Sequence, residues 1–199
     1  SSNLDEAGCP PGNTVPTNDP RVVTAADLQG WSWLTDGSSF DNLPITPVFT
    51  TAHDVGAGNG AASYPNASLS QPAITQATQP RMIVTNEFKD TRLADITALS
   101  YRTYSSDNAY APTLQFEINW SGAGSAWQGR LVFIPAAPTS GWRTWNTLDP
   151  SAGHWTTTNA AGGSCQHASC TWAQVLAQFP NATIDNPDPG KPTQGRLMV

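Results

Sequence analysis

The chain has 199 residues, a net charge of −6 and a pI of about 4.7. This length suits one all-β domain. Charged residues make up 12 % of the sequence, against about 25 % in an average globular protein. No basic patch is present to neutralise phosphates, so we expect no binding to nucleic acid or to anionic membranes. No hydrophobic run reaches the length of about 18 residues that a membrane span requires.

The residue composition favours an exported protein built from short strands. Eight Trp, six Phe and four Tyr argue against disorder. The many Gly and Pro residues suit tight turns between strands. Residues 1–20 predict a flexible N-terminal arm, and residues 21–199 predict a single β-sandwich domain. The high Ser, Thr and Asn content is typical of secreted proteins, and Ser1 is expected to be a mature N-terminus after signal-peptide removal.

Period-two alternation of apolar and polar residues predicts most of the strands. The first begins at Trp31, and segment 113–120 alternates most cleanly, with apolar side chains on one face and polar ones on the other. The remaining strands before the helix are predicted over 47–50, 73–76, 81–85, 95–104, 130–135, 142–147 and 153–157.

One short helix is predicted near 171–179. Its apolar residues fall at i, i+3, i+4 and i+7, and Pro180 ends it. Together these elements predict an all-β fold, an antiparallel two-sheet jelly-roll sandwich with one short helix.

The last predicted strand, 196–199, has no return strand after it. An uncovered strand edge invites pairing with another chain. We therefore expect either that the domain lacks its last strand or that it self-associates through the C-terminal strand.

Four segments resemble a group of uncharacterised secreted bacterial proteins. They read VVTAADLQGW at 22–31, LADITALSY at 93–101, LVFIP at 131–135 and WRTW at 142–145. In strand pattern the chain resembles laminin-G or concanavalin-like jelly rolls and carbohydrate-binding modules. The resemblance covers about residues 22–199 and implies no catalytic residue. Members of the group continue past the equivalent of Val199, which is consistent with a missing strand.

The sequence contains three cysteines, which can form a disulfide or bind a metal ion. Cys165 and Cys170 are separated by four residues, a spacing that favours a disulfide in an oxidising compartment. The alternative is a metal site formed by these thiolates with His167 or His154. Cys9 has no partner within this pattern.

Trp142, Trp145 and Trp155 are the candidate ligand-binding residues. A flat indole can stack against the C–H face of a sugar ring, and Trp supplies much binding energy from a small area. The alternative is that these indoles fill the core. Trp142 and Trp145 are three residues apart, so on a regular strand they face opposite sides and at least one of them is exposed.

No catalytic site is recognisable. Glycoside cleavage needs two facing carboxyl groups, and the sequence pairs no two acids; Glu117, on the polar face of its strand, is the best single candidate for a polysaccharide hydrolase or lyase. His53 lies beside Asp54, but the Gly-x-Ser-x-Gly signature of serine hydrolases is absent.

Loop oxygens suit a structural calcium ion. They come from Asp36, Asp41, Asn42, Asp185, Asn186 and Asp188. Ordinary turn chemistry explains the same residues.

The leading hypothesis is a secreted, non-catalytic extracellular module that binds carbohydrate, as a polysaccharide or a cell-surface glycan, or that forms part of a surface assembly. The alternatives are a structural subunit that assembles by strand sharing and a polysaccharide-active enzyme.

Overall fold

The structure is a computed structural model of the whole chain. It describes residues 23–35, 43–44, 49–50, 61–62, 81–105, 111–122, 128–136, 140–158, 163–184 and 197–198. The predicted arm at 1–20 and the predicted strand at 73–76 lie outside these residues.

Among the described residues, eight strands form one large antiparallel sheet, in the order β10-β8-β7-β12-β5-β1-β2, with β11 also paired to β7. The strands are β1 (Trp31–Thr35), β2 (Leu43–Pro44), β5 (Arg81–Thr85), β7 (Leu114–Asn119), β8 (Gly129–Pro135), β10 (Gly153–Thr158), β11 (Thr183–Ile184) and β12 (Leu197–Met198). Two small sheets pair β3 (Phe49–Thr50) with β4 (Ala61–Ala62) and β6 (Ser100–Ser105) with β9 (Gly141–Asn146). The predicted all-β character and antiparallel pairing are confirmed.

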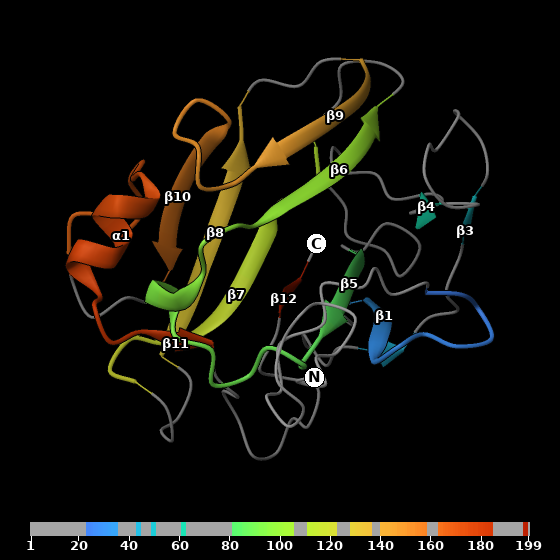
Figure 1. The fold of residues 1–199 in the computed structure, drawn as a ribbon, viewed down its shortest axis with the longest axis horizontal. Coiled ribbons are helices and arrows are strands. Elements are labelled where there is room, and N and C mark those ends of the chain that lie inside the picture. Colours follow the sequence, from blue (N-terminus) through green and yellow to red (C-terminus); the bar gives the residue numbers. More distant parts are fainter. Residues whose placement is uncertain are drawn as a thin grey trace, which may run out of the picture.

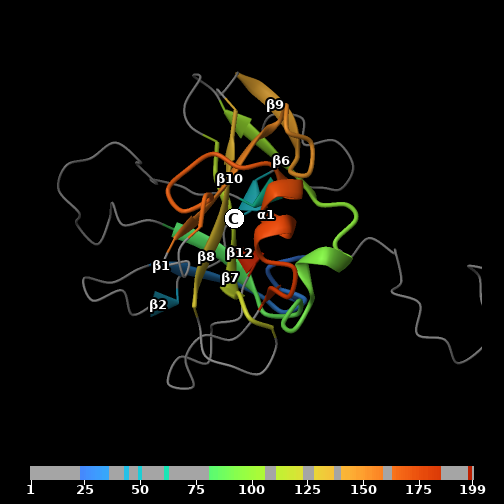
Figure 2. The ribbon, with the colours of Figure 1, turned by 90° about the vertical axis from the view of Figure 1, so that its left-hand side faces the viewer.

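The larger of the two core clusters lies on one face of the large sheet. Alternation along β7 points Leu114, Phe116 and Ile118 toward this face, and all three are buried. The covering elements are the helix α1 (Trp172–Gln178), the 3-10 turn η1 (Leu93–Asp95) and the β6–β9 sheet. Figure 1 shows β6 and β9 side by side. Figure 2 shows β7 and β8 of the large sheet nearly edge-on, with α1 and η1 on one side of them.

Helix α1 begins and ends where its sequence predicts, to within one residue. The Thr171 hydroxyl accepts a hydrogen bond from the Gln174 backbone N–H, and the Gln174 side chain accepts one from the Thr171 N–H. This reciprocal capping box satisfies two donors at the helix start. The buried side chains Trp172 and Val175 then face the core.

The prediction of a strand over 95–104 is wrong in its first half. Residues 93–95 form the η1 turn, in which the Ile96 N–H donates to the Leu93 carbonyl, and β6 begins only at Ser100. Alternation alone cannot distinguish a strand from an extended segment without a partner strand. The carbonyl of Leu99 instead accepts hydrogen bonds from the backbone N–H and the hydroxyl of Thr147.

The last strand lies in the interior of the large sheet. β12 pairs with β5 on one side, Leu197 opposite Thr85, and with β7 on the other, Leu197 opposite Phe116. Over Leu197 and Met198 both edges are therefore occupied. Self-association through the C-terminal strand stays a prediction, and it would have to use residues other than these two.

Candidate functional site

The outer face of the β6–β9 sheet carries the best candidate site. In its antiparallel register Tyr104 lies opposite Trp142, and Arg102 lies opposite Thr144. Directly paired residues project to the same side, and residues two apart on one strand share that side. These four side chains, Arg102, Tyr104, Trp142 and Thr144, therefore form one surface, which we call the aromatic–arginine face.

The geometry of the aromatic–arginine face is centred on Trp142. The ring centroids of Tyr104 and Trp142 are 5.5 Å apart with planes at 63°. The guanidinium carbon of Arg102 lies 4.8 Å from the Trp142 ring centroid, within the range of a cation–π contact. Tyr104 is 37 % exposed, Arg102 is exposed and Trp142 is half-buried. The face thus offers aromatic surface and guanidinium donors together.

The opposite face of the same two strands holds the sheet in place. Trp145 is 1 % exposed, and its indole N–H donates to the Thr103 hydroxyl at 2.9 Å. The Tyr101 hydroxyl donates to the Pro112 carbonyl at 2.7 Å, while its ring meets Phe133 of the large sheet edge to face. Because the Tyr101 ring packs against Phe133, the sheet that carries the aromatic–arginine face is anchored to the large sheet.

The structure does not bring the three predicted tryptophans to one surface. Trp155 is 1 % exposed, stacks on Phe116 at an interplanar angle of 5° and donates its indole N–H to the Thr147 carbonyl at 2.8 Å. Trp145 and Trp155 therefore belong to the core, which was the alternative interpretation for this cluster. Trp142 and Trp145 do face opposite sides of β9, and ligand binding by Trp142 stays a prediction.

The sequence places Glu117 on the polar face of its strand, and the structure buries that residue. Its side chain is 3 % exposed, and its carboxylate accepts a hydrogen bond from the Arg130 Nε at 2.9 Å across the β7–β8 pair. The polar residues Glu117 and Asn119 of β7 are buried. The alternating pattern therefore predicted on which side of the strand Glu117 lies, but it could not predict whether that side is exposed to water. Glycoside cleavage needs a second carboxyl group facing the first, and the group that faces Glu117 is the Arg130 guanidinium.

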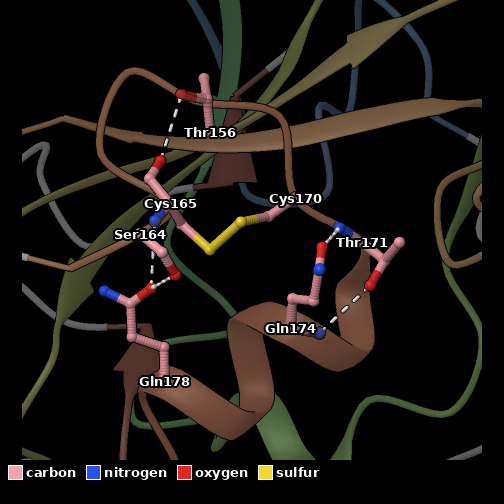
Figure 3. The surroundings of a disulfide bond; sticks show 7 residues. All are labelled: Thr156, Ser164, Cys165, Cys170, Thr171, Gln174 and Gln178. Atoms are coloured by element: carbon pink, nitrogen blue, oxygen red, sulfur yellow. Dashed lines mark hydrogen bonds between the residues drawn. A yellow bond between two sulfur atoms is a disulfide. The ribbon is translucent and has the colours of Figure 1, made fainter.

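The predicted disulfide is confirmed. Cys165 and Cys170 are bonded, so neither sulfur is a free thiolate and the alternative metal site with these cysteines is wrong. Figure 3 shows the bond between β10 and α1, with the Gln178 side chain accepting hydrogen bonds from the Cys165 N–H and the Ser164 hydroxyl. Within the described ranges no group of three His, Cys, Asp or Glu side chains could hold a metal ion.

Several predicted residues lie outside the described ranges. They are Cys9, Asp36, Asp41, Asn42, His53, Asp54, Asp185, Asn186 and Asp188. The calcium interpretation and the His–Asp interpretation of these residues therefore stay predictions.

Sequence reasoning missed Arg102 and Tyr104 as members of the site. Both lie in a predicted strand, at alternating positions, but their significance depends on β9, which begins 36 residues after β6 ends. A local signal was present: neither strand contains an Asp or a Glu.

Comparison of the chain with models of known protein families, with curated proteins and with solved structures finds no match. None of the helices in the described part of the chain has the length and apolar character to cross a membrane.

Proposed function

We propose that this chain is a secreted, non-catalytic module that binds carbohydrate through the aromatic–arginine face. The observation that carries the proposal is the position of Trp142, flanked by Tyr104 and Arg102 on the outer side of a supported two-stranded sheet. The C–H face of a sugar ring stacks on aromatic surface, and the N–H groups of an arginine donate to sugar oxygens. Neither requires a catalytic group.

The same proposal includes secretion of the protein and a jelly-roll arrangement of its sheets. A disulfide forms and persists in oxidising compartments, which supports secretion. The β6–β9 sheet packs through Tyr101 against Phe133 of the large sheet, which supports a jelly-roll sandwich of the kind found in laminin-G-like domains and carbohydrate-binding modules. The resemblance to secreted bacterial proteins points in the same direction.

Glycan binding of the Trp142→Ala variant tests the proposal. The wild-type chain is screened on a polysaccharide and glycan array, and its best ligand is then titrated by calorimetry. We expect Trp142→Ala to weaken binding about tenfold or more, because truncated interface aromatics cost about 2 kcal/mol. Phe88→Ala is the matched control, since Phe88 is 42 % exposed in the turn after β5.

Two results would contradict the proposal. One is the absence of any glycan ligand for the folded wild-type protein. The other is wild-type affinity in a Trp142→Ala variant whose circular dichroism spectrum and melting temperature are unchanged.

A further inference from the structure

The charge of the β6–β9 sheet is opposite to that of the whole protein. The chain carries 15 acidic and 9 basic residues. The two strands read SYRTYS and GWRTWN, so they contain two arginines and no acid. A ligand at this sheet therefore meets local positive charge on a molecule whose net charge is negative.

Arg102 supplies the accessible part of this charge. Two other arginines of the described chain are ion-paired, Arg92 with Asp95 and Arg130 with Glu117. Within the described residues the Arg102 guanidinium has no carboxylate partner, and it lies over the Trp142 ring. A guanidinium carries five N–H donors, and contact with an aromatic ring does not pair them with acceptor oxygens, so they can donate to an external acceptor.

The aromatic contact also fixes the direction of Arg102. Arginine side chains lose rotamer freedom when they bind, and this loss costs free energy. Here Arg102 and Tyr104 are two residues apart on β6, and the Trp142 ring lies against both. The guanidinium is therefore held next to the surface on which a sugar ring would stack.

On the basis of the carbohydrate-binding function proposed above, we infer that the ligand is an acidic polysaccharide whose hexuronate carboxylate pairs with Arg102. The guanidinium fork matches a carboxylate through two parallel hydrogen bonds. In a hexuronate the carboxylate is bonded directly to the sugar ring. The ring can therefore contact Trp142 and Tyr104 while its carboxylate reaches the adjacent guanidinium.

The negative net charge of the protein excludes general charge attraction as the cause of binding to a polyuronate. A net charge of −6 repels a polyanion at long range. Affinity for a polyuronate must then come from a local site, and it cannot be attributed to general attraction between opposite net charges.

Matched acidic and neutral polysaccharides test the inference. Polygalacturonate, alginate and hyaluronan are each titrated as the acid and as the methyl ester, which keeps the rings and linkages and removes the charge. At a salt concentration of about 0.05 M we expect at least one acid to bind about tenfold or more tightly than its ester, and the difference to shrink at about 0.5 M.

Two arginine variants locate the charge effect. Arg102→Gln keeps most of the side-chain length and removes the charge, so it should abolish the preference for the acid by weakening binding of the acid much more than binding of the ester. Arg92→Gln removes an exposed arginine of a different element and should change neither. Dextran sulfate and dextran form a further pair, in which sulfate presents charge without a carboxylate.

The failures of the two proposals are distinguishable. Equal binding of acid and ester, with both lost in Trp142→Ala, overturns the uronate inference and leaves the carbohydrate-binding proposal standing. Preference for dextran sulfate over every polyuronate, or binding to none of the three acids, also overturns the uronate inference. Absence of any ligand on the glycan array overturns both.

Discussion

Two tryptophans thirteen residues apart in sequence have opposite environments. Trp155 is enclosed by Phe116, Phe133 and Trp172, with its indole N–H bonded to a backbone carbonyl. Trp142 is half-buried on an outer strand face. We expect Trp155→Ala to lower the free energy of unfolding by about 3–5 kcal/mol through cavity formation. Chemical denaturation measures the loss, and a loss under about 1 kcal/mol would contradict the core assignment.

The carboxylate of Asp149 makes the stability of the fold depend on pH. Its carboxylate accepts hydrogen bonds at 2.8 Å from the backbone N–H and the hydroxyl of Ser151. The backbone hydrogen bond from Ser151, followed by the hydroxyl bond, lowers the pKa of Asp149 below its ordinary value of 3.8. A lowered folded-state pKa stabilises the protein above the unfolded pKa, and this contribution is lost as pH falls through the folded value.

Substitution of Asp149 by Asn tests this dependence. At neutral pH the wild-type protein should be more stable than Asp149→Asn, and the gap should narrow as pH falls below 3.8. Thermal unfolding across this range measures the gap. A gap of constant size at all pH values would show that the charge of Asp149 has no part in it.

The disulfide loop covers the outer edge of β10. The Trp155 N–H donates to the Cys170 carbonyl, the Cys170 N–H donates back to the Trp155 carbonyl, and the Thr157 N–H donates to the Cys165 carbonyl. An edge strand without such cover presents unpaired backbone groups to other chains. The cross-link therefore holds in place the segment that protects this edge.

Removal of the disulfide should destabilise the fold measurably. In the chain-entropy model a loop as short as this one contributes about 2 kcal/mol, so we expect a loss of that size in a variant with Cys165→Ser and Cys170→Ser, measured by urea unfolding. Gln178→Ala removes the tether to α1 and keeps the cross-link, and it should cost about 1 kcal/mol. An unchanged midpoint in the double variant would contradict the role of the cross-link.

Local sequence patterns predicted those elements that depend only on residues close together in the chain. The apolar stripe of β7, the capped helix α1 and the short Cys165–Cys170 spacing each follow from neighbouring residues. The partners of each strand could not be predicted in this way, because pairing depends on the whole chain. The surroundings of Glu117 and the meeting of Arg102 with Trp142 are consequences of that pairing.

The strand β12 connects two parts of the large sheet. In the strand order, β5, β1 and β2 lie on one side of it, and β7, β8 and β10 lie on the other. A variant with Leu197→Pro and Met198→Pro loses its backbone donors there. We expect it to lose at least about 2 kcal/mol of stability, because each buried carbonyl left without a donor costs about 1–3 kcal/mol.

A variant with Leu197→Ala and Met198→Ala is the matched control, since it shortens the side chains and keeps both backbone donors. Hydrogen exchange of the β5 and β7 amides reports the result. Faster exchange in both strands of the proline variant alone supports the connecting role, and identical exchange in the two variants would contradict it.

The central position of β12 also bears on how the protein is made. A ribosome releases the chain from its N-terminal end, so β1, β5 and β7 emerge long before residues 197–198. Until then β5 and β7 lack the strand that lies between them. Completion of the sheet is therefore a late event that follows synthesis of nearly the whole described chain, and the nascent polypeptide exposes two unsatisfied strand edges in the meantime.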